Sequence, residues 1–239
     1  MAWGKKSVGA SVFALLVASV ISGVAGVSAP PCLVAQSQVP TTQQQAPTLQ
    51  TLAGRVDRHY NQLRSLKASF SESYEGLGMR RTERGTLLLM KPGRMCWTYS
   101  EPKGKLFVLD GKFAWFYADG DPQVQRIAAS KLDDMRSPLR FLLGRTQLQK
   151  ELTGLTLSTA PNGGFMLAGK LKGQEKRVAQ VRLTVTLSGS ITRIEIEEVD
   201  GAITTFTLRD EEPNAAISPD SFRFNPPTGV PVVDALPPI

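Results

Sequence analysis

Two short stretches, KPGRMCWTYSEP at residues 91–102 and LDGKFAWFY at residues 109–117, decide how this chain folds. Each contains a Pro-Gly or Asp-Gly turn signal followed by large side chains at every second position. A period of two is typical of a β-strand with one buried face. Met95, Trp97 and Tyr99 are therefore predicted to share one strand face. The pattern alone fits either a packed core or a surface for an apolar ligand.

Apolar alternation and turn signals continue through most of the chain. A first strand is predicted from Ala68 to Glu75, and further strands at residues 85–90, 95–100, 106–109, 113–117, 155–158, 165–171, 181–187, 191–199 and 203–208. Several of these are separated by glycine-containing turns typical of hairpins, so neighbouring strands are expected to be antiparallel. Consecutive hairpins with one apolar face predict a strongly curved antiparallel sheet, or open β-barrel.

Two helical patterns could cover the dry face of this sheet. The first is an apolar stripe with spacings of three and four residues, formed by Leu49, Leu52, Val56, Tyr60, Leu63 and Leu66. The second is a short helix at residues 137–144, with Ser137 as its cap and Pro138 at its first position. The predicted fold class is mainly β with some α: an open antiparallel β-barrel with a helical lid over an apolar cavity.

Residues 1–35 have the pattern of a secretory signal peptide. Lys5 and Lys6 precede an uncharged run of mostly small residues. The alternative is a transmembrane anchor, since the run is nearly long enough to span a bilayer. We expect cleavage between residues 25 and 35. Residues 36–48, rich in Gln, Thr and Pro, are predicted to form a flexible linker, and residues 49–239 a single domain.

The cleavage site decides how many cysteines remain. A cut after Ala35 leaves Cys96 alone, whereas a cut after Ala25 leaves Cys32 and Cys96, which could pair in an oxidising compartment. Lipidation at Cys32 is a further alternative. One or two thiols are too few for a disulfide scaffold, so the fold must depend on its apolar core.

The charge of the chain is moderately basic. Lys and Arg number 28 against 21 Asp and Glu, a net charge of +7. Loss of residues 1–35 removes two lysines and no acids, so the charge falls to +5. This balance fits either an anionic lipid surface, an acidic partner or ordinary solubility. Because the basic residues are scattered rather than clustered, no nucleic-acid partner is expected.

The sequence contains no evident catalytic or metal-binding constellation. His59 is the only histidine, and its position on the predicted helix is typical of an exposed residue. Without a second histidine or a cysteine cluster, zinc has no convincing ligand set. We therefore expect neither an enzyme nor a cofactor or bound metal.

The same stretches carry a resemblance to a known family. Residues 85–97, then Pro102, residues 110–112, Trp115 and Tyr117, resemble the periplasmic outer-membrane lipoprotein carrier family, LolA. Two further regions do so as well: the junction from Leu63 to Ser71, and the ending Phe222 to Val230, which is similar to the family's C-terminal strand and turn. The resemblance covers most of residues 50–234.

The resemblance implies a monomeric periplasmic chaperone that holds lipoprotein acyl chains in an apolar cavity. Its implied partners are acylated lipoproteins, an inner-membrane ABC-type release complex and an outer-membrane acceptor. The implied cavity residues are Leu88, Met90, Met95, Trp97, Leu109, Trp115 and Phe141, with a second lid element at residues 139–143. Lys91 stands where relatives commonly have an arginine that holds the lid closed. Because lysine lacks the planar fork of arginine, its latch is expected to be looser or different.

Two alternatives within the same fold remain open from the sequence. One is a membrane-anchored lipoprotein acceptor, which lipidation at Cys32 would favour. The other is a lipid-sensing module that shares the sheet but signals rather than transports. Cys96 occupies a position where many relatives have arginine, and it has no implied role.

Overall fold

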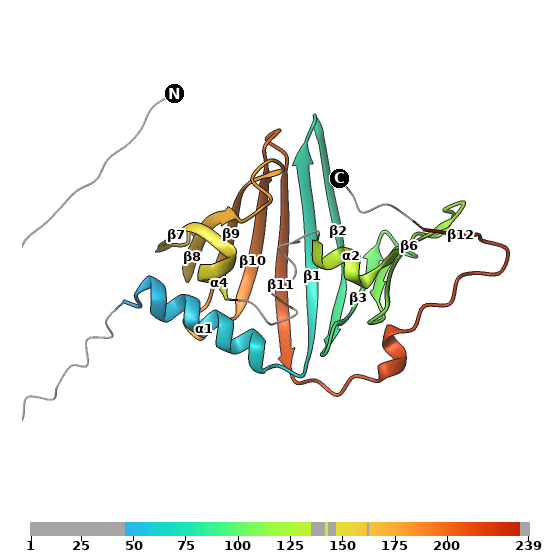
Figure 1. The fold of residues 1–239 in the computed structure, drawn as a ribbon, viewed down its shortest axis with the longest axis horizontal. Helices are drawn as coiled ribbons and strands as arrows, with labels where there is room; N and C mark the ends of the chain where they lie inside the picture. Colours follow the sequence, from blue (N-terminus) through green and yellow to red (C-terminus); the bar gives the residue numbers. More distant parts are fainter. Residues whose placement is uncertain (1–45, 135–141, 143–146, 162, 235–239) are drawn as a thin grey trace, which may run out of the picture. The chain divides into compact units, whose positions relative to one another are not determined.

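A computed structural model describes residues 46–134, 142, 147–161 and 163–234. These residues form one twelve-stranded sheet, in the order β12-β6-β5-β4-β3-β2-β1-β11-β10-β9-β8-β7. The sheet is curved and open, because its edge strands β12 and β7 do not pair with each other within the described residues (Figure 1). The predicted fold class, mainly β with a strongly curved, open sheet, is confirmed.

Several predicted segments lie outside the described residues. They are the leader at residues 1–35, the linker as far as residue 45, and the short helix at residues 137–144 except Leu142. Among the residues that the structure does describe, no helix has both the length and the apolar character needed to cross a bilayer.

Helix α1 (Leu49–Gln62) is the longest helix described. The side chain of Thr48 caps it by accepting a hydrogen bond from the Thr51 N–H at 3.2 Å. The predicted apolar stripe is present, but the helix ends before Leu66, which belongs to the first strand. The apolar spacing continues from α1 into β1 because the helix and the strand bury their apolar residues in the same core.

One wing of the sheet is a meander of antiparallel neighbours that starts at the centre and runs outward. Its strands are β1 (Ser65–Gly76), β2 (Met79–Met90), β3 (Arg94–Glu101), β4 (Leu106–Leu109), β5 (Phe113–Tyr117) and β6 (Val124–Ala128). The sequence did not predict β6, and β2 begins at Met79 rather than at the predicted residue 85. The added residues of β2 are mostly polar and solvent-accessible, so they carry no alternation of apolar residues.

The chain then crosses to the opposite edge and returns strand by strand to the centre. The crossing includes two short helices that the sequence did not predict, α2 (Ala129–Asp134) and α4 (Leu148–Glu151). The second wing consists of β7 (Leu152–Thr159), β8 (Phe165–Leu171), β9 (Val178–Val185), β10 (Ile191–Glu198) and β11 (Ile203–Pro213). The last strand, β11, pairs with β1, so the centre of the sheet joins two strands that are distant in sequence.

Figure 1 shows α1 lying across the second wing. The turn between β9 and β10 presses directly on this helix, because a Cβ atom at Gly189 would lie 2.5 Å from the carbonyl carbon of Arg55. Gly189 also has a positive φ of 98°. Only glycine satisfies both conditions without strain. The Arg55 guanidinium donates to the Leu187 carbonyl at 2.9 Å and fastens the same contact.

The C-terminal segment Phe222–Val230 contains the turn that the resemblance implied, in which the Val230 N–H donates to the Pro227 carbonyl at 3.1 Å, but the described residues there form no strand. Residues 219–222 form a 3-10 helix, η1 (Pro219–Phe222), and the only later strand described is β12 (Val232–Asp234). This strand pairs with β6 in parallel, the one parallel pairing among the described strands. The prolines at 226 and 227 explain the correction, since proline cannot donate a hydrogen bond to a sheet.

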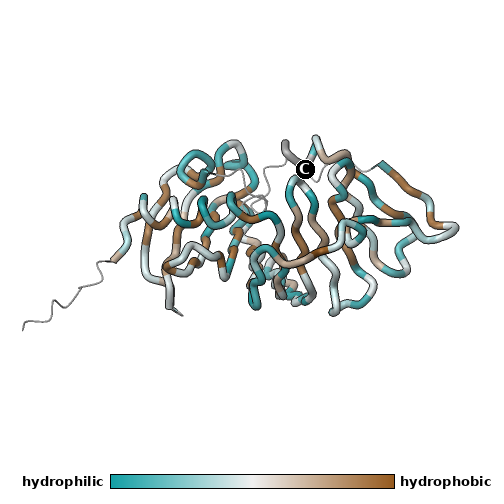
Figure 2. Tube along the Cα trace, turned by 90° about the horizontal axis from the view of Figure 1, so that it is seen from below, coloured by the Kyte–Doolittle hydropathy of each residue, from teal (hydrophilic) through white to brown (hydrophobic). Residues whose placement is uncertain are grey.

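The sheet carries an apolar cluster on each face, a large one that extends over both wings and a small one on the first wing only. Hydrophobic and hydrophilic residues alternate along the strands in Figure 2. The larger cluster includes the α1 side chains Leu52, Val56 and Tyr60, and we call its side of the sheet the helix-covered face. The smaller cluster includes Phe222, and we call its side the opposite face.

Candidate functional site

The predicted cavity residues do not all lie together. Met95, Trp97 and Leu109 belong to the cluster on the helix-covered face. Leu88, Met90 and Trp115 pack in the cluster on the opposite face. Phe141 lies outside the described residues, although Leu142, from the predicted lid segment 139–143, is buried in the cluster of the helix-covered face.

The sheet register explains this division. Leu89 pairs with Met95 and Leu87 pairs with Trp97 across β2 and β3. Because directly paired residues point to the same face, the partners of the aromatic strand are Leu87 and Leu89. Leu88 is displaced from them by one residue, which reverses its face. Because residues 87–89 are all leucine, no polar residue indicates which of them share a face with Met95 and Trp97.

Aromatic rings form the centre of the helix-covered face. The Phe70 ring lies 4.5 Å from the Trp97 ring and 5.0 Å from the Tyr99 ring, with edge-to-face geometry in both pairs. The ring centroids of Trp97 and Phe206 are 5.5 Å apart. Gly85 makes this packing possible, since a Cβ atom there would approach the Phe70 ring to 2.7 Å. The rings come from β1, β3 and β11, so the cluster crosses the join between the wings.

Trp97 has an unsatisfied donor inside this cluster. Its side chain is 2 % exposed, and its indole Nε1–H has no hydrogen-bond partner among the residues that the structure describes. A buried donor without an acceptor costs about 1–3 kcal/mol. Such a group can bind a carbonyl oxygen that enters the cluster, and this property is absent from an ordinary aliphatic core.

Beyond Tyr99 the helix-covered face becomes polar. The Tyr99 hydroxyl donates to the Glu72 carboxylate at 2.9 Å. Burial, followed by the charge of Glu72, raises the pKa of Tyr99. Glu83, only 5 % exposed, accepts a hydrogen bond from Lys105 and pairs with Arg81 at 3.3 Å. This group of charged and hydroxyl side chains, which we call the polar belt, limits the apolar area toward the β1–β2 turn.

The opposite face is closed by the C-terminal segment. Phe222 is 1 % exposed, and the Phe224 ring lies 5.7 Å from the Trp115 ring. Trp115 differs from Trp97 because its Nε1–H donates to Asp110 at 2.8 Å. Cys96 is buried in this cluster, and burial raises the pKa of its thiol.

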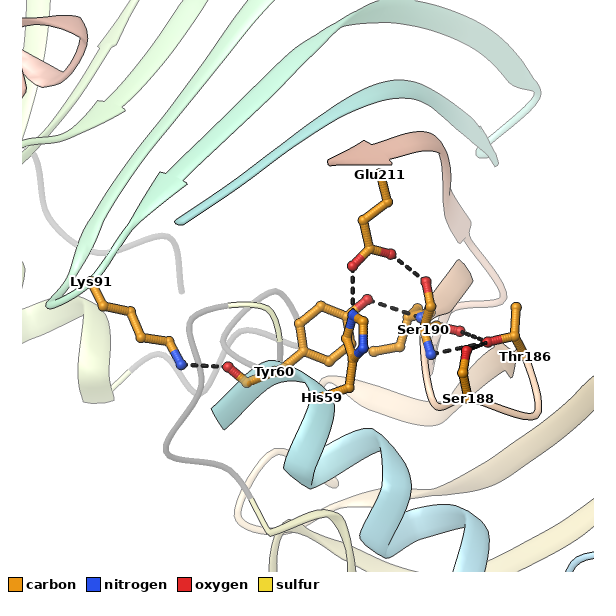
Figure 3. Close-up of polar contacts among 8 residues, drawn as sticks. His59, Tyr60, Lys91, Thr186, Ser188, Ser190 and Glu211 are labelled. Atoms are coloured by element: carbon orange, nitrogen blue, oxygen red, sulfur yellow. Dashed lines mark hydrogen bonds and ion pairs between the residues drawn. The ribbon is translucent and has the colours of Figure 1, made fainter. Parts of the chain in front are cut away.

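Lys91 lies at the end of β2 and reaches the C-terminal end of α1. Its ammonium group donates to the backbone carbonyl of Tyr60 (Figure 3). Carbonyls at a helix C-terminus lack intrahelical partners and carry partial negative charge, so they favour a cation. Lys91 thus connects the first wing to the helix that covers the second.

The other side of Tyr60 is fixed to the second wing. Its hydroxyl, fully buried, accepts a hydrogen bond from the Ile191 N–H at 2.9 Å. Burial is the main cause of the raised pKa of Tyr60, and the nearby charge of Glu211 adds to it. The end of α1 is therefore held from both wings through one residue.

A polar cluster that sequence reasoning missed lies beside Tyr60. His59 Nε2 is 2.6 Å from the Glu211 carboxylate, and the Ser190 hydroxyl donates to the same carboxylate (Figure 3). His59 was predicted to be an exposed helix residue, but its side chain is only 20 % exposed and is hydrogen-bonded to Glu211. Glu211 lies at a β-bulge in β11, where the register with β1 shifts and Asp210 has a φ of 52°. Such bulges reorient side chains and leave no pattern in the sequence.

Within the described part of the chain, no group of three or more His, Cys, Asp or Glu side chains converges to hold a metal ion. The larger apolar cluster instead contains both the aromatic rings and the buried side chains of α1, and the polar belt limits it toward the β1–β2 turn.

These features define a class of protein: a single curved, open sheet whose larger apolar cluster is shared with a helix rather than with a second sheet. The model of the family described as outer membrane lipoprotein carrier protein LolA matches residues 61–225. The chain therefore belongs to the LolA family, which confirms the resemblance inferred from the sequence.

Curated relatives match most of the chain. An outer-membrane lipoprotein carrier protein from Nitrosospira multiformis is 28% identical over 75% of this chain and 87% of its own length. The protein of the same name from Pectobacterium carotovorum is 28% identical over 85% of this chain and 95% of its own. Among solved structures, a LolA superfamily protein from Nitrosomonas europaea matches with a TM-score of 0.39 and 12% identity, over 75% of this chain and 99% of its own.

Proposed function

We propose that this protein is a periplasmic, non-catalytic chaperone that carries lipoproteins from the inner to the outer membrane. Their acyl chains would bind against the helix-covered face, in a space opened by movement of α1. The observation that carries the proposal is the aromatic cluster on the helix-covered face, which belongs to the same apolar core as α1 and contains a Trp97 donor that is unpaired among the described residues. Family membership supports lipoprotein cargo.

In this proposal Met95, Trp97 and Leu109 line the lipid-binding space. Leu88, Met90 and Trp115 are left out, because they lie on the face that the C-terminal segment covers. Phe141 and its neighbours would form a second lid element. Lys91 is the latch, and its bond to the Tyr60 carbonyl keeps α1 closed when no cargo is present.

The energetics permit such an exchange. Exposing the α1 side chains Leu52, Val56 and Tyr60 would cost roughly 5–9 kcal/mol, at about 1.5–3 kcal/mol for each buried side chain. An acyl chain of about sixteen carbons, at ~0.8 kcal/mol per methylene, recovers on the order of 12 kcal/mol when it is taken out of water. One chain is therefore enough to displace the helix, and an acceptor need offer only slightly better burial to remove the chain again.

The proposed partners follow from this cycle. An inner-membrane ABC-type release complex would supply acylated lipoproteins, and an outer-membrane acceptor would receive them. The carrier would act as a monomer. The polar belt lies at one end of the aromatic cluster, which suits the water-facing peptide portion of a lipoprotein better than its acyl chains.

Adjacent residues of β4 provide a matched test. Phe107 packs with the helix-covered cluster, whereas the neighbouring Leu106 packs with the opposite one, and both are partly exposed. Phe107→Ser should weaken binding of a triacylated peptide by roughly tenfold or more, because about 1.5–3 kcal/mol of apolar contact is lost. Leu106→Ser should leave that affinity within about twofold of the parent. Equal effects of the two changes would contradict the proposed face.

Native purification from an envelope extract tests the physiological cargo. Mass analysis should find acylated lipoproteins bound to the parent protein. Recovery of free phospholipid alone would instead support a lipid-sensing module. A mature N-terminus that begins at a lipidated Cys32 would support a membrane-anchored acceptor.

A further inference from the structure

The turn between β1 and β2 has an unusual surface. Leu77 is 76% exposed and Met79 is 62% exposed, the two most exposed large apolar side chains among the described residues. Figure 1 shows this turn at the far end of the two longest strands, next to the β10–β11 turn. The pairing of Glu75 with Ile203 confirms that the two turns are neighbours.

These apolar side chains are not an extension of the core. The polar belt, with Glu72, Glu83 and Lys105, lies between them and the aromatic cluster on the same strands. Their exposure therefore does not result from incomplete coverage by α1. Neither side chain belongs to the apolar cluster of either face.

The turn itself does not favour leucine. Leu77 and Gly78 both have positive φ, 52° and 75°, as a two-residue hairpin turn of type I′ requires. Asn, Asp or Gly is favoured at the first of these positions, whereas leucine is strained there. Leu77 is therefore unfavourable for the local stability of the turn, and its exposed apolar side chain is also unfavourable for solubility.

Basic side chains follow the apolar ones immediately. Arg80 is paired with Glu75 at 2.6 Å but remains 73% exposed. Arg81 is 57% exposed and shares the buried Glu83 with Lys105, and Glu72 of the same polar belt balances the second positive charge. The neighbouring turn has a different character, because Val199 is flanked by Glu198 and Asp200. The basic character is confined to the β1–β2 turn.

We propose that the β1–β2 turn is a membrane-contact site, in which Leu77 and Met79 insert into the surface of an anionic phospholipid bilayer while Arg80 and Arg81 face its headgroups. Two protruding side chains fall well below the ~800 Å² per partner that a stable protein interface buries. They are suited to the boundary between headgroups and acyl chains, where small apolar insertions and nearby arginines add their contributions. The inference does not depend on the proposed cargo.

Flotation with vesicles tests this site directly. The exported protein is mixed with vesicles of phosphatidylglycerol and phosphatidylethanolamine. The variant Leu77→Ser/Met79→Ser should lower the partition coefficient at least roughly tenfold, as expected from the loss of two inserted side chains. Leu187→Ser removes another exposed apolar residue, at the β9–β10 turn, and should leave partitioning unchanged. High salt, or vesicles without phosphatidylglycerol, should weaken binding by roughly fivefold for each of the two exposed arginines that face the headgroups.

Methionine oxidation provides a second readout that needs no variant. Met79 should be oxidised by peroxide in solution and protected when vesicles are present, whereas Met166 in β8 should react equally in both conditions. Unchanged oxidation of Met79 on vesicles, or equal flotation of the double variant and the parent, would overturn the proposal. Loss of a dimer in the double variant, without any flotation of the parent, would overturn it in favour of self-association.

The outcome is separable from that of the proposed function. Binding of triacylated peptide without vesicles should be the same for Leu77→Ser/Met79→Ser as for the parent. Failure to bind the peptide would refute the cargo proposal and leave the membrane-contact site standing. Normal peptide binding without vesicle contact would do the reverse.

Discussion

Lys91→Met tests whether one lysine holds the end of α1 to the first wing. The substitution keeps an unbranched apolar stem and removes the ammonium group that donates to the Tyr60 carbonyl. A hydrogen bond with one charged partner contributes about 1.5–3 kcal/mol, and this one also places a cation at a helix C-terminus. We expect a loss of about 2 kcal/mol in the free energy of unfolding. For a domain of this size, that loss corresponds to a decrease of about 4–8 °C in Tm.

The chain offers a matched control for this experiment. Lys67 is a lysine with a different partner, the Glu212 carboxylate at 2.9 Å, and both of these side chains are about half exposed. Because exposed ion pairs contribute little, Lys67→Met should cost no more than about 0.5 kcal/mol. Lys91→Arg should retain most of the parent stability, since arginine can still donate to the carbonyl.

Urea unfolding, followed by circular dichroism, measures all three variants. Hydrogen exchange at the last turn of α1 should also become faster in Lys91→Met and stay unchanged in Lys67→Met. If Lys91→Met and Lys67→Met have equal unfolding free energies, the latch contributes nothing and the reasoning is refuted. If Lys91→Met is destabilised but α1 exchanges normally, the lysine stabilises the sheet rather than the helix end.

Two further predictions concern other polar contacts. Burial alone would raise the pKa of Asp110, but hydrogen bonds from the Phe113 N–H, the Trp115 indole and the Lys112 N–H outweigh it and lower the pKa below its ordinary value of 3.8. The ionised Asp110 should therefore stabilise the fold fully well above pH 3.8, and this stabilisation should decrease as the pH falls through the lower folded-state pKa. Asp110→Asn should lower the free energy of unfolding by about 1–3 kcal/mol at neutral pH. Urea titrations of this variant at several pH values should lack this part of the acid dependence. A double-mutant cycle with His59→Gln and Glu211→Gln should give a coupling energy of about 1 kcal/mol between α1 and β11, and strict additivity of the two unfolding free energies would show that their contact is incidental.

Alternation predicted the sheet well, because strands with one buried face repeat apolar residues with a period of two. Met95, Trp97 and Tyr99 share a face as expected, and α1 covers that face. Alternation failed at Leu88, where a continuous run of leucines contains no polar residue to mark the register. It also failed at Trp115, because β5 turns its Ala114 and Phe116 toward the helix-covered face and its larger ring away from it.

The contacts of α1 lay beyond sequence reasoning for a different reason. Tyr60, Ile191 and Glu211 come together only through the pairing of β1 with β11 and a bulge in the latter. Lys91 was predicted to hold a lid, and its contact with Tyr60 fits that role, which remains a proposal. A one-residue bulge or a helix-end contact has no periodic signature, so no local pattern could have indicated the cluster around His59.

The pairing of β1 with β11 also affects the order in which parts of this protein fold. Each wing is a series of local hairpins, which close quickly, whereas the join pairs Leu66 with Pro213 and Glu75 with Ile203 across nearly the whole domain. The aromatic cluster spans this join, with Phe70 on one side and Phe206 on the other. A chain in which β11 has not yet paired with β1 therefore lacks the complete aromatic cluster and exposes the open edge of β1 to proteases. If this face binds lipid as proposed, the protein gains that ability only when the two wings join.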